Sequence, residues 1–169
     1  MTTLDLRTLR LAPGEQFRDT RAVDLDPLEL GGLRYAPQPE SREVALTLTR
    51  MTTGLLLELA FEARLVGPCF RCLAETEVAT EISGREYQAS DPGADEDLRT
   101  PYVADDRVDL SAWARDAVVL SLPEKILCRP DCAGLCPVCG GDLNMSPHEH
   151  DDEAGDPRWA ALADLRERL

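Results

Sequence analysis

The chain has 169 residues, a formal net charge of −14, and 43% hydrophobic but only 5% aromatic residues. This length indicates one domain, or one domain with a metal-bound appendage, and the composition predicts an aliphatic core. The acidic excess argues against nucleic-acid binding over much of the surface, since phosphate binding requires clustered Lys and Arg. No apolar run approaches the roughly 20 residues that span a bilayer, and the N-terminus lacks the pattern of a signal peptide. We therefore expect a soluble cytoplasmic protein with no membrane partner.

The first half of the chain predicts strands. Residues 1–34 carry short apolar alternations broken by Pro and Gly, which indicates an irregular segment with one or two short strands. Residues 42–90 are strand-rich, with alternation from residue 44, a hairpin signal at residues 52–54, and a returning strand that ends near Gly67. One face of that strand is expected to carry Leu57, Leu59, Phe61 and Ala63. A further strand over 75–87 completes an antiparallel meander.

A helix is expected after an acidic segment. Residues 91–106 combine Asp, Glu, Pro and Gly, which predicts a loosely held loop. Asp109 or Ser111 can cap the helix that follows, whose apolar residues recur with helical spacing. Pro123 prevents its continuation. The main helix is therefore predicted near residues 109–121.

All six cysteines and both histidines of the chain fall into four close pairs. The pairs are Cys69/Cys72, Cys128/Cys132, Cys136/Cys139 and His148/His150. Zn²⁺ takes four N or S ligands, which tight turns usually supply in pairs, so eight candidates make two closed sites. A closed site has no open position for water or substrate, which argues against catalysis at the metal. We predict one or two structural zinc ions.

The eight candidates can be divided in two ways. Cys136, Cys139, His148 and His150 form a self-contained C-x2-C-x8-H-x-H unit, which leaves the other four cysteines for a second site. The rival division places Cys128, Cys132, Cys136 and Cys139 on one ion, in a compact loop that Gly134 and Pro137 would allow.

Two other chemistries compete with zinc at these cysteines. Disulfides are one, but a chain that is not exported is expected to keep its thiols reduced. A redox motif at CFRC (residues 69–72) is the other. A thioredoxin-type motif lies at a helix N-terminus, which stabilises the thiolate, whereas CFRC lies between strand-like segments and is expected to lack that stabilisation.

These elements together predict an α+β fold. A small antiparallel sheet or meander with one main helix forms a β-rich body over residues 1–127. A Cys/His zinc-binding tail over residues 128–169 follows, with a short C-terminal helix that begins at Asp156 and has Pro157 in its first turn.

Two acidic stretches carry most of the net charge. Residues 86–109 hold eight acids and two arginines, and residues 142–156 hold six acids and no base. Two solvated loops are the simplest structural explanation, and a basic protein is the partner that such stretches favour. The acidic candidates for partner binding are Asp95, Glu96, Asp97, Asp105 and Asp106.

Arginines offer an alternative contact surface. Arg42, Arg50 and Arg64 lie in the strand-rich region, spaced so that some could share a face. Direct RNA contact is the second possibility for them, although a mixed surface is favoured because acids share the same stretch. No catalytic set emerges, since no histidine lies outside the metal candidates and no nucleophile, phosphate-loop or dinucleotide motif is present.

Several segments together resemble the YceD family. They are CFRC after a hairpin, VDLSAWARDAVVLSLP, CRPDCAGLCPVCGGDLN and the closing DPRWAALADL. Residues 42–169 carry the resemblance, and the first forty carry little of it. His148 and His150 stand where similar proteins often have a C-x-C pair, and histidine is an equally good zinc ligand.

The resemblance implies a function. The family is named for accumulation of large-subunit ribosomal RNA in bacteria and plastids. It implies a non-enzymatic role in large-subunit biogenesis, on which the level of 23S ribosomal RNA depends. The expected partner is a large-subunit ribosomal protein or a precursor particle, with contact to 23S RNA indirect or through the arginines. A CxxC thiol oxidoreductase and a zinc-stabilised adaptor outside the ribosome are the other hypotheses.

Overall fold

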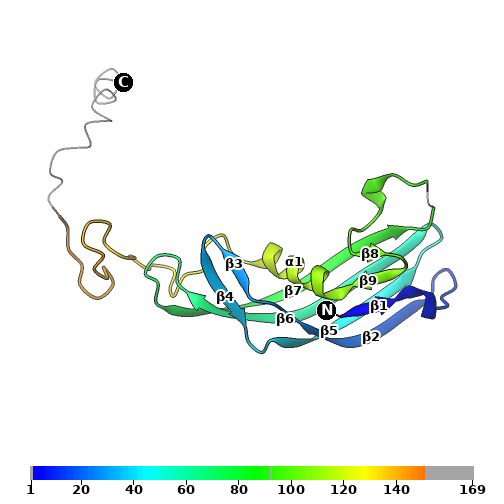
Figure 1. The fold of residues 1–169 in the computed structure, drawn as a ribbon, viewed down its shortest axis with the longest axis horizontal. Coiled ribbons are helices and arrows are strands. Elements are labelled where there is room, and N and C mark those ends of the chain that lie inside the picture. The colour runs from blue at the N-terminus through cyan, green and yellow to red at the C-terminus, as the bar shows by residue number, and fades with distance from the viewer. Residues whose placement is uncertain (1, 92, 151–169) are drawn as a thin grey trace, which may run out of the picture.

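The computed structural model describes residues 2–91 and 93–150. Figure 1 shows an elongated molecule in which long antiparallel strands run along the body and one helix lies on the sheet. The strands of the described residues are β1 (Thr3–Asp5), β2 (Gln16–Asp24), β3 (Leu28–Leu30), β4 (Leu33–Pro37), β5 (Ser41–Arg50), β6 (Gly54–Pro68), β7 (Glu75–Ala89), β8 (Val103–Ala104) and β9 (Arg107–Asp109). The helices there are α1 (Leu110–Ser121) and the 3-10 turns η1 (Leu6–Thr8) and η2 (Glu96–Leu98).

The strand β6 organises the larger sheet. It pairs with β7 along its whole length, from Gly54 opposite Ala89 to Pro68 opposite Glu75. Its other edge is shared by β5 and β4, and β2 and β3 extend the sheet to six strands. The turn between β6 and β7 is therefore carried to one end of the molecule. A separate three-stranded sheet has the order β1-β9-β8.

Alternation along the strands places the core on one face. Leu57, Leu59, Phe61 and Ala63 are buried, as the sequence predicts. The helix covers this face, and its Trp113 is buried against β7 at Gly84, where a Cβ would lie 3.1 Å from the indole nitrogen. Burial of an aromatic side chain of this size contributes roughly 3–5 kcal/mol by the cost of its truncation. The opposite sheet face is left to water, as antiparallel sheets allow.

The structure corrects two predictions about irregular segments. The first 34 residues contain the nine-residue strand β2, which pairs with β5 along its length, although its own sequence is mostly polar. Tertiary pairing with an apolar neighbour creates this edge strand where local pattern does not predict it. The predicted loose loop over 91–106 instead holds η2, β8 and the buried side chain of Thr100.

The α+β prediction is confirmed, although six strands form a larger sheet than the small one expected. The Asp109 carboxylate caps α1 by accepting from the Ala112 amide at 3.0 Å, whereas the Ser111 hydroxyl accepts from the Thr2 amide. The helix predicted from Asp156 lies outside the described residues. None of the helices in the described part of the chain is long and apolar enough to cross a membrane.

Candidate metal centres

Four cysteine sulfurs from two distant segments meet at one end of the sheet. The β6–β7 turn brings Cys69 and Cys72, and the segment after α1 brings Cys128 and Cys132. We call this group the four-sulfur cluster. All its sulfurs lie within 4.8 Å of one another, with Cys69 to Cys132 at 3.8 Å and Cys72 to Cys128 at 3.6 Å.

These distances fit a tetrahedral zinc. Sulfurs that each lie about 2.3 Å from a zinc are about 3.8 Å apart in a regular tetrahedron. A disulfide requires about 2.05 Å between sulfurs, and all six cysteines are free. The donor set therefore fits zinc.

Backbone hydrogen bonds shape the β6–β7 turn around Cys69. Its amide donates to the carbonyl of Ala74 at 2.7 Å, and its carbonyl accepts from the Leu73 amide at 3.0 Å. Leu73 closes the turn in the left-handed region, at φ 61. The Phe70 amide donates to the Ile126 carbonyl at 2.8 Å, which fixes the turn against the segment that leads to Cys128.

Arg71 attaches the second cysteine segment to this turn. Its guanidinium donates to the Cys132 carbonyl at 2.7 Å, and its own carbonyl accepts from the Leu135 amide at 3.2 Å. Gly134 permits the approach, because it has φ +85 and an added Cβ would lie 3.2 Å from the Arg71 carbonyl oxygen. Sequence reasoning placed Arg71 only among the arginines of the strand-rich region and gave it no part in the metal site, since a lone arginine between two cysteines has no distinctive pattern.

The turn itself stabilises a thiolate. Burial of the Cys69 sulfur opposes ionisation, but backbone amides of Cys72, Cys128 and Arg71 outweigh it and lower the pKa of Cys69 to about 6. The sequence led us to expect no such stabilisation at CFRC, because no helix begins there. That expectation was wrong about the effect, since backbone amides of the turn and of Cys128 supply what a helix N-terminus would supply. Zinc binds the thiolate form, so the shift also favours a metal ligand.

The remaining four candidates form a second group, which we call the Cys/His cluster. It contains Cys136, Cys139, His148 and His150, whose ligand atoms also lie within 4.8 Å of one another. Of these four residues, Cys136 alone is buried. The structure thus brings the ligands together in the first of the two divisions and not in the rival one.

Hydrogen bonds orient His148 toward the thiols. Its Nδ1 lies 2.8 Å from the Ser146 carbonyl, and its Nε2 lies 3.1 Å from the Cys139 sulfur. A histidine that donates one ring N–H to a carbonyl presents the other nitrogen to a metal. The Ser146 carbonyl and then the Cys139 thiol raise the pKa of His148 to about 9.

A tight turn presents Cys136 and Cys139. The Gly140 amide donates to the Cys136 carbonyl and the Cys136 amide donates to the Gly141 carbonyl, both at 2.8 Å. Gly140 has φ +71, which favours glycine. The Cys139 amide is the main cause of a pKa of about 6 at Cys136.

Asn144 connects the two clusters. Its side-chain amide nitrogen lies 3.6 Å from the Cys132 sulfur and 2.7 Å from the Asp142 carboxylate. Its side-chain oxygen accepts from the Ala133 amide at 2.8 Å. Sequence reasoning missed Asn144, and its only signal is its place between the Cys136/Cys139 pair and the His148/His150 pair.

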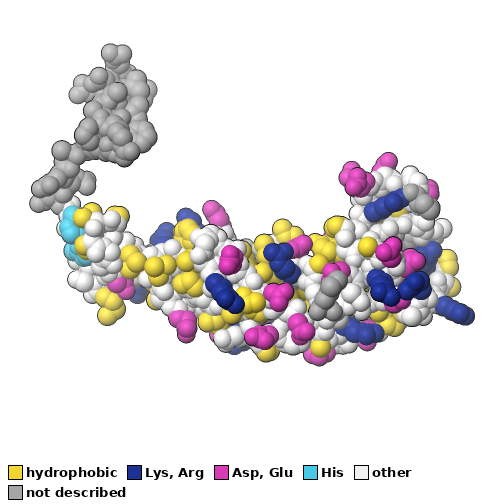
Figure 2. Space-filling view, viewed as in Figure 1, with side chains coloured by type: hydrophobic (Ala, Val, Ile, Leu, Met, Phe, Trp, Pro, Cys, Tyr) yellow, Lys and Arg dark blue, Asp and Glu magenta, His cyan; other side chains and the backbone are white. Residues whose placement is uncertain are grey.

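The acidic candidates lie at the other end of the molecule. Asp95, Glu96 and Asp97 belong to the η2 region, and Asp105 and Asp106 form the β8–β9 turn with positive φ. All five are exposed. Figure 2 shows acidic side chains on the projecting loop at this end and the histidines at the opposite end.

The three arginine candidates do not form one surface. Arg42 and Arg64 line one shallow hollow, where Arg64 pairs with Glu77 at 3.2 Å. Arg50 lines a different and larger hollow. An RNA surface built from all three together is therefore not what the fold presents.

Comparison with known proteins places the chain in a family. Residues 57–166 match the family described as large ribosomal RNA subunit accumulation protein YceD. The uncharacterized protein Rv2926c of Mycobacterium tuberculosis is 36% identical over 96% of this chain and 80% of its own length. The uncharacterized protein YlbN of Bacillus subtilis is 28% identical over 64% of each chain.

A plant relative carries a functional name. The large ribosomal RNA subunit accumulation protein YCED homolog 1, chloroplastic, of Zea mays is 40% identical over 31% of this chain and 17% of its own length. No solved structure matches the chain. The match over residues 57–166, which contains all eight candidate ligands, shows that the chain belongs to the YceD family.

Proposed function

We propose that this protein is a non-enzymatic factor of large ribosomal subunit biogenesis, needed for accumulation of 23S ribosomal RNA. The observation that carries the proposal is membership of a family described by that accumulation. The name of the maize relative supports the same role. In this proposal the protein works in the cytoplasm, with residues 1–127 as its body and residues 128–169 as a metal-binding tail.

Both clusters hold zinc in this proposal, and the metal is structural. Each cluster offers four sulfur or imidazole ligands, which leaves no coordination position for water. Binding of such an ion contributes on the order of 10 kcal/mol to folding of the segments that it joins. A thiol oxidoreductase would need Cys69 and Cys72 free to exchange, whereas this proposal commits both thiolates to the metal.

The partner is a basic ribosomal protein, or a precursor particle that displays one. Five exposed carboxylates at the β8–β9 end form a surface that attracts a basic protein and speeds its association at low salt. Contact with 23S RNA is then indirect. The RNA accumulates because ribosomal proteins assemble on it, and this chain contacts those proteins rather than the RNA.

Affinity purification from cells tests the proposal, with protein and RNA in the eluate identified together and particles separated by sedimentation. The chain is expected to sediment with large-subunit precursors, and depletion is expected to lower 23S RNA. The acidic variant combines D95N, E96Q, D97N, D105N and D106N. The arginine variant combines R42Q, R50Q and R64Q.

The two variants separate contact through protein from contact through RNA. We expect the acidic variant to recover less ribosomal protein and the arginine variant to behave nearly as the wild type. Loss of particles only in the arginine variant, together with loss of crosslinks to 23S RNA, would show direct RNA recognition instead. A chain that never sediments with precursors would contradict the proposed function itself.

A further inference from the structure

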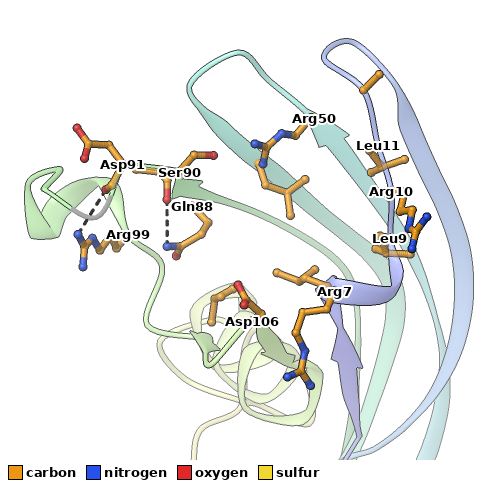
Figure 3. A pocket seen from close by; sticks show the side chains of 15 residues that line it. Arg7, Leu9, Arg10, Leu11, Arg50, Gln88, Ser90, Asp91, Arg99 and Asp106 are labelled. Carbon is orange, nitrogen blue, oxygen red and sulfur yellow. Dashed lines mark hydrogen bonds between the residues drawn. The ribbon is translucent and has the colours of Figure 1, made fainter.

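A hollow of about 850 Å³ opens at the end of the molecule away from the metal clusters. It lies between residues 6–12 on one side and the ends of β5, β6 and β7 on the other. We call it the arginine hollow. Figure 3 shows the Arg50 side chain between the segment that carries Leu9 and Leu11 and the strand end that carries Gln88.

The charge of the hollow is opposite to that of the chain. Four arginines and two aspartates line it, in a protein whose net charge is −14. The Arg7 guanidinium forms an ion pair with the Asp5 carboxylate at 2.6 Å. The Arg99 guanidinium donates a hydrogen bond to the Asp91 carbonyl at 3.4 Å. The guanidinium groups of Arg10 and Arg50 make no ion pair with any residue that the structure describes. They are therefore available to an anion.

Apart from these charged residues, Gln88 and Ser90, the lining is aliphatic. Leu9 and Leu11 are partly buried, and Leu55 is buried below them. A ligand that fits the hollow offers a carboxylate and an aliphatic side chain.

We propose that the arginine hollow binds a peptide segment in which an acidic residue adjoins an aliphatic one. The guanidinium fork of Arg50 or Arg10 matches a carboxylate in two parallel hydrogen bonds. The leucines take the aliphatic side chain. This hollow adjoins the acidic candidates at Asp106, but the proposal does not rest on the proposed ribosomal function.

The lining favours a peptide over single-stranded RNA. Bases bind single-strand sites by stacking on aromatic side chains, and none of the described residues that line the hollow is aromatic. The acidic stretch over residues 86–109 also borders the hollow and would repel a polyphosphate chain. One or two carboxylates meet less repulsion than a run of phosphates.

Selection from a phage-displayed random decapeptide library on the purified full chain tests the proposal. The double variant R10Q/R50Q removes the two available charges. The control R18Q/R34Q removes two exposed arginines that do not line the hollow, with the same change in net charge. Selected peptides and a fluorescent ten-residue oligouridylate are then titrated against all three proteins by fluorescence anisotropy.

The selected peptides are expected to be rich in Asp or Glu next to Leu, Ile or Val. Their affinity should fall at least tenfold in R10Q/R50Q and less than twofold in R18Q/R34Q. Failure to enrich such peptides, or equal affinity for both double variants, would overturn the proposal. Tight binding of the oligouridylate that R10Q/R50Q abolishes would assign the hollow to RNA and overturn it as well.

Discussion

The two metal clusters each offer four ligands, but they differ in ligand type and in position. The four-sulfur cluster joins residues 63 positions apart, and Cys69 and Cys132 within it are fully buried. The Cys/His cluster lies within one short segment, and its ligands other than Cys136 are not buried. Position in the fold therefore decides how far the loss of a metal spreads. Loss at the first cluster detaches a segment from the sheet, whereas loss at the second loosens only a local turn.

The largest effect is expected for C69S. This change removes a buried ligand from the β6–β7 turn and leaves three thiolates without a complete metal site. Loss of a structural metal belongs to the mutations that cost more than about 4 kcal/mol of unfolding free energy. Denaturant unfolding checks the stability, and hydrogen exchange should show faster exchange at the β6–β7 end. A C69S variant as stable as the wild type would contradict the claim that the four-sulfur cluster stabilises the body.

The matched change in the other cluster is C136S. We expect faster exchange in residues 136–150 and loss of one zinc, because this cluster joins only neighbouring residues. The free energy of unfolding of the body should change by less than about 0.5 kcal/mol, as for surface substitutions. Equal perturbation of the same amides by C136S and C69S would mean that the two clusters act as one unit.

A smaller effect, on zinc affinity, is expected for N144A. This variant tests whether a residue from the segment of the Cys/His cluster supports the four-sulfur cluster. The variant loses the contact with the Cys132 sulfur and the bond from the Ala133 amide. Loss of such an outer contact typically weakens metal affinity roughly 10–100-fold. Competition with a zinc-binding dye should show the weakening at the four-sulfur cluster. The neighbouring M145A is the control, because Met145 is largely exposed, and an equal loss there would exclude a specific role for Asn144.

Local pattern predicted the parts of the fold that carry their own signal. The alternation in β6 and the cap at Asp109 can be predicted from the sequence, because the residues that are buried or that cap the helix lie close together in the chain. The strand β2 cannot be predicted in this way, since its own sequence is mostly polar and its neighbour β5 supplies the apolar residues.

The same distinction holds for the sites. The paired ligands were predictable because the two members of each pair lie close together in the sequence, whereas Arg71 and Asn144 act through contacts across segments. The arginine hollow could not be predicted, because residues 6–12, Arg50 and Gln88 meet only in the folded chain.

Native mass spectrometry during stepwise chelation tests the central claim most directly. The purified chain is expected to carry two zinc ions and to lose them in two separate steps. Hydrogen exchange should increase within residues 136–150 at the first step and at the β6–β7 turn only at the second. Purified protein without zinc, mapped disulfides between these cysteines, or release of both ions in one step would contradict the account.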